Sequence, residues 1–487
     1  MGGDAADHSP ARGVLQGVAG RAVYFAAGYL ASIVLARRLG PAAYGAYGLV
    51  MSVLLWVEQI GKFTFAPAAA KLIAERGPGA QALEHTASFL NFAFFAVVFA
   101  LFWLAAPWLS AIFELGEDSV RWFRIAAVDL PIFGWYALNR GVLLGRRQFF
   151  AASVADALYS VMKFVGAVVL LTVWLSVASA LAVNILASLV AGTFLLSRVS
   201  IRFRRPEPGA AGPLVRLALP LGFYMMMLQT LTSLDLWLLK TLGPSGDEAT
   251  VGLYVAARNV ALVPSVIFMV VSDILLPSIS GALAAGDTPT SRRYLQGGVR
   301  FLCVCLLPVC LLFAFGADAV MTLLYSSSFR AGGLYLSILI WSAVSLPFLD
   351  LFAAALSAKG HPFLSGTVMA GLLPAAILLN VFLVPAFGAV GAAAASVVTG
   401  ALAALAVGLL VYQRFGPLLK SRTTLNTTIA LVVMAAVASR IDAAGIMLWI
   451  ALAGCLGIYG LTLLVLGELT LAELRTLAVL RGDGRRT

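Results

Sequence analysis

Ten charged side chains lie inside long apolar runs of this sequence. The basic ones are Arg21, Lys62, Lys163 and Arg258, and the acidic ones are Glu58, Asp129, Asp156, Asp235, Asp273 and Asp350. Ionisable groups at the depth of a bilayer are costly, so they usually face a cavity or a partner. These residues are therefore the first candidates for a binding site.

Arg21 and Arg258 are the most suggestive of the four cations. Neither has an acid three or four residues away, so neither can form a local helical ion pair. A guanidinium group holds phosphate oxygens in a bidentate geometry even where little water is present. The sequence therefore suggests that both bind an anionic group. The alternative for Arg21 is that it extends to the membrane interface.

The remaining charges allow two interpretations. Glu58 and Lys62 are four residues apart, which is the spacing of a local ion pair on a helix. Alternatively, Lys62 lines a cavity together with Lys163, with its charge only partly neutralised. The same cavity would hold the acids of its region, Glu58, Asp129 and Asp156.

Oxygen-bearing side chains in the second half suggest a site for a hard cation such as sodium. Asp235, Asn380 and Thr399 lie in three different apolar runs and offer carboxylate, amide and hydroxyl oxygens. Hydrogen bonding between helices is the alternative for Asn380 and Thr399. The four cysteines and three histidines are not spaced as metal ligands or as a disulfide framework, so we expect no metal site and no cofactor.

The composition requires a membrane. Apolar residues make up 61% of the 487 residues, charged residues 11%, and the mean hydropathy is +0.97, whereas a soluble domain carries about 25% charged residues. Apolar runs long enough to cross a bilayer follow one another along the chain. The fourteen predicted spans are 14–36, 43–65, 87–113, 119–140, 151–175, 177–198, 214–239, 250–275, 294–316, 333–357, 363–384, 388–412, 424–440 and 444–466.

The basic residues predict the orientation of these spans. If the N-terminus is cytoplasmic, the two termini and the even-numbered connections hold 22 Lys and Arg, against seven in the odd-numbered connections. Such an excess marks the cytoplasmic side, so both termini are expected in the cytoplasm. The net charge of +11 then reflects topology, and we expect no nucleic-acid partner.

The two halves of the chain repeat each other. The segment 39–47, Leu-Gly-Pro followed by Tyr-Gly-Ala-Tyr, returns at 242–254 as Leu-Gly-Pro followed by Gly-Leu-Tyr. A second pair of similar segments is 127–131 and 343–347. Both repeats join spans of the same direction, which relates the halves by an axis along the membrane normal. This pattern predicts an all-α protein with two pseudo-symmetric six-helix lobes around a central cavity.

Domain boundaries follow from the repeat and from a linker rich in Arg, Pro and Gly after the sixth span. They are an N-terminal lobe at 1–200, a cytoplasmic linker at 201–213, a C-terminal lobe at 214–415, two further helices within 416–466, and a cytoplasmic tail at 467–487. No stretch is long enough for a soluble catalytic domain. The sequence therefore favours a transporter over an enzyme.

Several motifs resemble those of the polysaccharide biosynthesis flippases of the multidrug/oligosaccharidyl-lipid/polysaccharide exporter superfamily. They are Arg37-Arg38-Leu39-Gly40-Pro41 with Tyr44-Gly45, Asp235 with Leu239-Lys240-Thr241-Leu242-Gly243, and the segment 388–393. The resemblance covers roughly residues 12–415. It implies alternating access and, in the lipid II branch, arginines of the first and eighth spans at the head group. Arg21 and Arg258 match those positions, and Asp235, Asn380 and Thr399 match a sodium site in the C-terminal lobe.

Three functions remain open. The first is a flippase that moves an undecaprenyl-diphosphate-linked oligosaccharide from the cytoplasmic to the periplasmic leaflet of the inner membrane, for O-antigen or other lipopolysaccharide, capsule or exopolysaccharide assembly. It would contact membrane lipid, use Na⁺ or H⁺ as coupling ion, and dock with a polysaccharide polymerase complex. The second is a cation-coupled multidrug antiporter on the same fold, and the third an integral-membrane polymerase or glycosyltransferase.

Overall fold

The structure is a computed structural model that describes residues 10–199, 209–244, 246–440 and 446–469. Within these ranges the side chains of residues 10–22, 78, 270, 273, 274 and 446 are not described. The predicted linker and tail therefore lie largely outside the described residues. So do the side chains of Arg21 and Asp273.

The described chain is helical, as the sequence predicts. Its α-helices are α1 (Pro10–Arg76), α2 (Gln81–Ile112), α3 (Ser119–Gly145), α4 (Phe149–Val173), α5 (Val177–Leu196), α6 (Ala211–Leu242), α7 (Glu248–Ala284), α8 (Thr288–Phe301), α9 (Leu307–Phe315), α10 (Ala317–Leu324), α11 (Gly332–Ala358), α12 (Pro362–Phe415), α13 (Ser421–Ala438) and α14 (Ile446–Val465). A π-helical segment, Leu302–Leu306, joins α8 to α9, and short 3₁₀ turns cover Gly77–Gly79 and Ser327–Phe329.

Glycines divide the two longest helices. Gly40 in α1 has φ 72° and Gly388 in α12 has φ 57°, a left-handed region that a residue without Cβ enters at low cost. Gly40 lies between the predicted spans 14–36 and 43–65, and Gly388 is the first residue of the predicted span 388–412, so α1 and α12 carry two spans each. Both glycines belong to motifs that carried the family resemblance. Gly40 precedes Pro41 in the first motif, and Gly388 opens the segment 388–393.

All fourteen predicted spans coincide with helical segments. Eleven described helices are long and apolar enough to cross a membrane, and two of them are the 54-residue stretches Val23–Arg76 and Pro362–Phe415. The span predicted at 119–140 corresponds to α3, which is not among the eleven. The division at Trp174–Ser176 is confirmed, because α4 ends at Val173 and the Ser176 side chain caps α5. The protein is therefore a multi-pass membrane protein.

Contacts divide the chain into two compact units, each described here by itself. The first unit contains Met1–Val255, Leu324–Ser328 and Met369–Ala392, and the second contains Ala256–Leu323, Phe329–Val368 and Ala393–Thr487. The division groups the residues that pack together in this structure. The lobe limits proposed from the repeat, at 200 and 214, stay a prediction.

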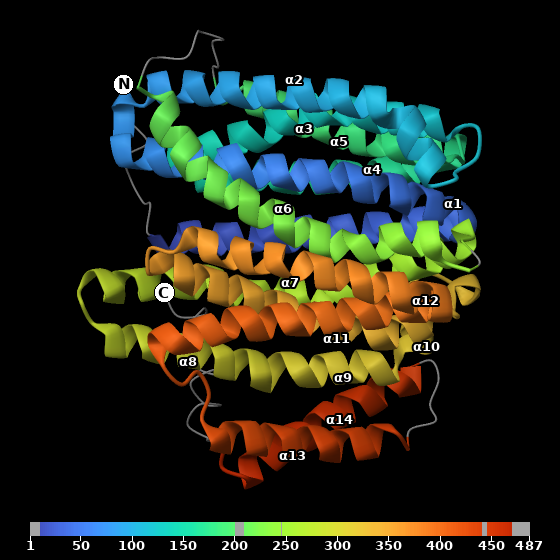
Figure 1. Cartoon of the computed structure of the whole chain (residues 1–487), viewed down its shortest axis with the longest axis vertical. Helices are drawn as coiled ribbons and strands as arrows, with labels where there is room; N and C mark the ends of the chain where they lie inside the picture. Colours follow the sequence, from blue (N-terminus) through green and yellow to red (C-terminus); the bar gives the residue numbers. More distant parts are fainter. Residues whose placement is uncertain (1–9, 200–208, 245, 441–445, 470–487) are drawn as a thin grey trace. The chain divides into compact units, whose positions relative to one another are not determined.

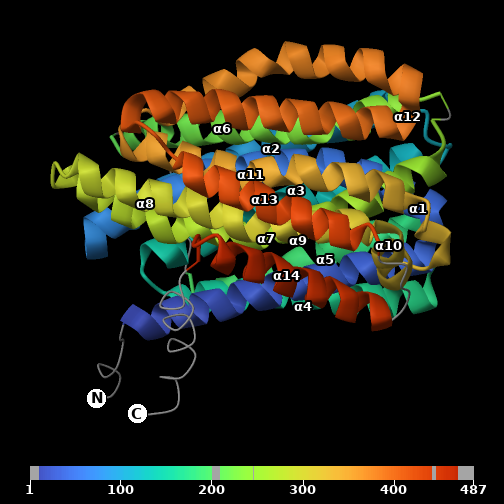
Figure 2. The same cartoon turned by 90° about the horizontal axis from the view of Figure 1, so that it is seen from below.

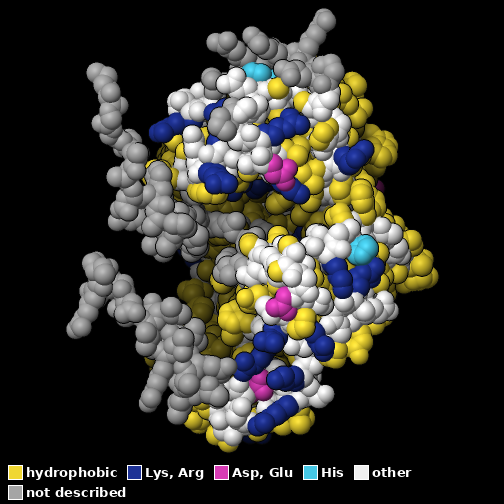
Figure 3. Space-filling model, turned by 90° about the vertical axis from the view of Figure 1, so that its left-hand side faces the viewer, with side chains coloured by type: hydrophobic (Ala, Val, Ile, Leu, Met, Phe, Trp, Pro, Cys, Tyr) yellow, Lys and Arg dark blue, Asp and Glu magenta, His cyan; other side chains and the backbone are white. Residues whose placement is uncertain are grey.

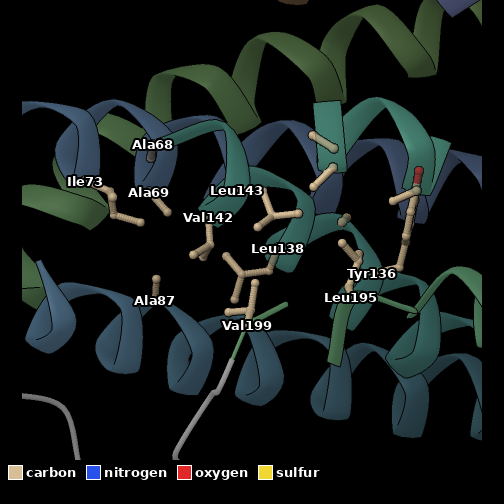
Figure 4. Packing of buried hydrophobic residues seen from close by; sticks show 14 of the residues in the cluster. Ala68, Ala69, Ile73, Ala87, Tyr136, Leu138, Val142, Leu143, Leu195 and Val199 are labelled. Carbon is tan, nitrogen blue, oxygen red and sulfur yellow. The ribbon is translucent and has the colours of Figure 1, made fainter. Parts of the chain in front are cut away.

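Helix α1 organises the first unit, where it packs against α3, α4 and α6. Helices α2, α3, α5 and α4 run alongside one another (Figure 1). Small side chains contribute to the contact of α1 with α3, where Ala68 and Ala69 of α1 lie near Val142 of α3 in a buried cluster (Figure 4). Small residues let membrane helices approach closely, which favours van der Waals packing between them.

Phe95 shows how closely these helices approach. A Cβ atom added at Gly61 would lie 2.3 Å from its ring, and one added at Gly134 would lie 2.2 Å from it. The ring is 1% exposed, so it fills the space that these two glycines leave in α1 and α3. Side chains on the opposite face of α2, such as Leu104 and Trp108, are exposed, as expected where a helix meets lipid.

In the second unit α13 and α14 pair with each other and pack against α9 (Figure 1). Glu468, just beyond α14, fixes this pair from its end. Its Oε1 accepts hydrogen bonds from Nε of Arg300 at 2.9 Å and from Thr423 at 2.8 Å, and its Oε2 accepts one from Asn426 at 3.2 Å. Burial opposes the charged form, but these donors hold the pKa of Glu468 below its usual range.

Replacing Glu468 with glutamine is expected to loosen α13 and α14. Hydrogen bonds to a charged group are worth about 1.5–3 kcal/mol each, so the thermal stability of the purified protein should fall. Because the pKa of Glu468 is lowered, the wild type keeps this stabilisation at neutral pH and loses it as the pH falls below the usual range of a glutamate. Melting curves at several pH values test this. Equal melting of both proteins at neutral pH would contradict it.

Candidate functional site

Polar side chains from four helices meet inside the first unit. Helix α1 contributes Glu58 and Lys62, α3 contributes Asp129, α4 contributes Asp156, Tyr159 and Lys163, and α5 contributes Asn184 and Ser188. We call this group the inner polar cluster. Glu58 is 1% exposed and Asp129 is fully buried, so their charges cannot be solvated by bulk water.

Glu58 and Asp129 are neighbours within the cluster. Their carboxyl groups lie within hydrogen-bonding reach of each other, and both experience the charge of Lys163. Asn184 donates a hydrogen bond to Oδ2 of Asp129 and accepts one from the hydroxyl of Tyr159 at 3.1 Å. Oε1 of Glu58 and Oδ1 of Asp129 are buried and accept no hydrogen bond in the described structure.

The two lysines have different surroundings. Lys163 is half-buried, with its ammonium 5.9 Å from the centre of the Tyr159 ring and close to both acids. Lys62 lies over the rings of Tyr24 and Phe63, at 5.7 and 5.6 Å. The structure places Lys62 and Lys163 with the predicted acids, and the carboxyl group of Asp129 lies within hydrogen-bonding reach of Glu58.

Asp156 belongs to a closed ion pair. Its Oδ1 accepts hydrogen bonds from Nε of Arg140 at 2.5 Å and from the hydroxyl of Tyr136 at 2.6 Å. Arg140 is 24% exposed and Asp156 is 11% exposed. Because α3 continues to Gly145, Arg140 remains inside the helix and reaches α4. Arg140 is the last residue of the predicted span 119–140 and was not among the candidate charges, so this pair was not predicted.

Asn184 and Ser188 were also missed. They are four residues apart in α5, and the sequence signal was their polarity inside an apolar span, which is typical of hydrogen bonding between membrane helices. Nothing in the sequence tells which of several such residues face an acid. Their place beside Asp129 is a result of how α3 and α5 pack.

The other candidate residues lie elsewhere. The side chain of Arg21 is not described, and Arg258 is half-buried on α7 in the second unit. Asp235 on α6 accepts a hydrogen bond from the hydroxyl of Tyr254 at 2.6 Å. Asn380 and Thr399 are both buried, and each has an oxygen without a hydrogen-bond partner in the described structure. A cation site made of Asp235, Asn380 and Thr399 stays a prediction.

The first pair of repeated segments, 39–47 and 242–254, meets in the first unit. A Cβ atom added at Gly45 would lie 1.9 Å from the carbonyl oxygen of Glu248, and one added at Gly252 would lie 1.9 Å from that of Pro41. Backbone thus touches backbone where the second part of α1 crosses the first turns of α7. We call this contact the glycine crossing.

Hydrogen bonds continue the contact along α1. Trp56 donates to the hydroxyl of Thr230 at 2.9 Å, and Trp237 donates to the hydroxyl of Ser52 at 2.9 Å. Near the Gly40 break, Nε of Arg37 donates to the carbonyl of Leu324 at 2.8 Å, and the rings of Tyr44 and Tyr325 lie 6.4 Å apart. The motif around Gly40 therefore packs against two segments that are distant in sequence, the first turns of α7 and residues 324–325.

Residues 12–282 match the family described as polysaccharide biosynthesis protein. The chain belongs to this family. The match covers more than half of the chain and includes the glycine crossing and the inner polar cluster. Among curated protein sequences none matches the chain.

Solved structures of transporters share the fold. The lipid II flippase MurJ in its inward closed conformation superposes with a TM-score of 0.74 at 14% identity, over 92% of this chain and 98% of MurJ. An inward-facing multidrug resistance MATE family transporter of the MOP superfamily gives 0.71 at 16% identity, over 82% of this chain and 98% of that one. The chain therefore has the two-lobed fold that the resemblance implied.

A third similar structure has a binding pocket of reversed polarity. It is a MOP superfamily transporter from Pyrococcus furiosus, for which the reversed polarity suggests a different function, with a TM-score of 0.63 and 18% identity over 83% of this chain and 94% of that one. Proteins of this fold thus differ in the charges of their binding pockets. The charged residues of each chain must be considered individually.

Proposed function

We propose that this protein is an alternating-access flippase that moves an undecaprenyl-diphosphate-linked oligosaccharide from the cytoplasmic to the periplasmic leaflet of the inner membrane. The observation that carries the proposal is the family match over residues 12–282. The similarity of fold to the lipid II flippase MurJ supports a lipid-linked substrate. The product would enter O-antigen, capsule or exopolysaccharide assembly, and a polymerase complex would be its natural partner.

Four cations inside the spans fit such a substrate. In the proposed mechanism Arg21 and Arg258 contact the diphosphate, and Lys62 and Lys163 line the path of the head group. Bidentate guanidinium contacts give an anion both charge and a fixed orientation. Sodium, held by Asp235, Asn380 and Thr399, is one candidate for the coupling ion.

The charge distribution supports the proposed orientation. Lys and Arg dominate the charged side chains on the end of the helices seen in Figure 3. Exposed residues of this type include Arg147 after α3 and Arg293 in α8, both in connections assigned to the cytoplasm. Under the positive-inside rule these connections would face the cytoplasm, as would both termini.

A multidrug antiporter is the second candidate. The MATE family transporter has a similar fold, and the buried acids Glu58 and Asp129 would suit a cationic substrate. The basic residues Lys62 and Lys163 in the same cluster favour an anion instead. A polymerase or glycosyltransferase has no support from these comparisons, since the similar solved structures are transporters and a flippase.

Cells that lack this protein are expected to accumulate lipid-linked sugar intermediates on the cytoplasmic face of the membrane. The wild-type protein should reverse the accumulation, whereas Arg258→Ala should do so about ten- to a hundredfold more slowly, because charge-assisted hydrogen bonds of about 1.5–3 kcal/mol would be lost. Mass spectrometry of extracted lipids, combined with a label that reaches only the outer leaflet, measures this.

A matched control is Arg293→Ala, which removes an exposed arginine and should behave like the wild type. If the deletion produced no accumulation and instead made the cells sensitive to cationic drugs, the flippase proposal would be wrong. Full activity of Arg258→Ala would remove the diphosphate contact from the mechanism.

A further inference from the structure

Two buried carboxyl groups in the inner polar cluster face each other without a donor between them. Glu58 is 1% exposed and Asp129 is fully buried, and their carboxyl groups lie within hydrogen-bonding reach of each other. Each has one oxygen without a hydrogen-bond partner in the described structure, Oε1 of Glu58 and Oδ1 of Asp129. An ionised carboxylate only accepts hydrogen bonds, so two of them cannot satisfy each other.

The groups around the two acids do not supply the missing hydrogen-bond donor or balance the charge. From α4, Lys163 acts on both acids, and from α1, Lys62 acts on Glu58 but lies over the rings of Tyr24 and Phe63. Asp156 is compensated by Arg140. From α5, Asn184 already donates to the other oxygen of Asp129, and the hydroxyl of Ser188 lies beside Asp129. The hydroxyls of Tyr47 and Tyr159 also lie near both acids but are neutral. The two acids together with Lys163 carry one net negative charge in a buried setting, which is unfavourable unless a cation joins them.

A single proton fits this place. Bound to either carboxylate, it is donated to the other, so one proton provides a partner for both orphaned oxygens. No covalent bond of the protein breaks, and the net charge of the two acids and Lys163 becomes zero. A hard metal ion, in contrast, takes about six oxygen ligands. The cluster offers few beyond the two acids and the hydroxyl of Ser188, and no group of three acids, histidines or cysteines lies together among the described residues.

We propose that Glu58 and Asp129, balanced by Lys163, form a proton-binding site inside the first unit that loads and releases one proton in each transport cycle. The binding of a proton rests on the burial of both acids and on their unpartnered oxygens. Its use in transport rests on the proposed flippase function. The site differs from the sodium site considered for Asp235, Asn380 and Thr399, because it lies on α1, α3 and α4.

Infrared difference spectroscopy of the full-length protein in lipid vesicles tests the binding step. On a change of pH, the wild type should show the C=O stretching band of one protonated carboxyl group. Glu58→Gln and Asp129→Asn should each lose that band. Lys163→Gln should show a second protonated carboxyl group, because both acids must then be neutral.

Glu84→Gln is the matched control. Glu84 is a buried acid of the same unit, but it is paired with Arg146 through two hydrogen bonds, so its replacement should leave the band unchanged. A band that survives in both Glu58→Gln and Asp129→Asn would overturn the proposal. So would binding of radioactive sodium that these two variants abolish.

A transport assay tests the coupling. In cells that lack the protein, Glu58→Gln and Asp129→Asn should reverse the accumulation of lipid-linked sugars at least about tenfold more slowly than Glu84→Gln. Wild-type rates for both variants would show that the site is not used in transport. The spectroscopic result does not depend on the substrate, so a failed flippase proposal and a failed proton site are distinguished.

Discussion

Gly45→Ala and Gly252→Ala are each expected to abolish transport while the protein is still made and inserted. The added Cβ would lie 1.9 Å from a backbone carbonyl oxygen, that of Glu248 or of Pro41, and no backbone atom can move aside as a flexible side chain would. Overpacking costs about 1–3 kcal/mol or more. The packed crossing of α1 and α7 would thus be disfavoured by about five- to more than a hundredfold.

The reason for a functional effect is alternating access. A transporter must be able to form and break such close contacts between helices as its cavity changes sides. A variant that cannot close the glycine crossing would be held in other conformations. A cysteine introduced beside the crossing, for example by Tyr44→Cys, should therefore be more accessible to a thiol reagent in both glycine variants.

Gly281→Ala is the control for this prediction. Gly281 also lies in α7, and an added Cβ would meet nothing within 4 Å. This variant should transport like the wild type. Normal transport by Gly45→Ala and Gly252→Ala would show that the crossing opens widely enough to accept a methyl group, and would exclude it as an obligatory contact.

Asp156→Ala is expected to destabilise the protein strongly. Without the carboxylate, Arg140 keeps its charge in a largely buried site and the hydroxyl of Tyr136 loses its acceptor. Breaking a buried ion pair by removing one partner costs about 3–5 kcal/mol. The purified protein should therefore lose its native elution profile at a lower temperature than the wild type.

The double variant Arg140→Met/Asp156→Leu separates a charge effect from a packing effect. It removes both charges and replaces them with apolar side chains, which is often neutral or stabilising for a buried pair. Its stability should recover most of the loss seen in Asp156→Ala. An unchanged melting temperature of Asp156→Ala would show that water reaches Arg140 and satisfies it.

The secondary structure and the membrane character could be predicted from the sequence. Hydropathy and helix length are local properties, so all fourteen predicted spans coincide with helical segments. Even the break between Val173 and Val177, where the apolar run is hardly interrupted, was predicted. The breaks in α1 and α12 fall at glycines, Gly40 before Pro41 and Gly388, where the sequence placed the ends of spans. The family could also be inferred, because its motifs are short and continuous.

Which polar residues meet depends on the packing of the helices and could not be predicted. The spacing of Glu58 and Lys62 allowed a pair on one helix, and it gave no sign that Asp129 of α3 lies within hydrogen-bonding reach of Glu58. Asp156 was a candidate for the cavity, yet Arg140 and Tyr136 satisfy it. The physical reason is that hydropathy depends on each residue separately, whereas the partner of a buried charge depends on how the helices rotate and pack.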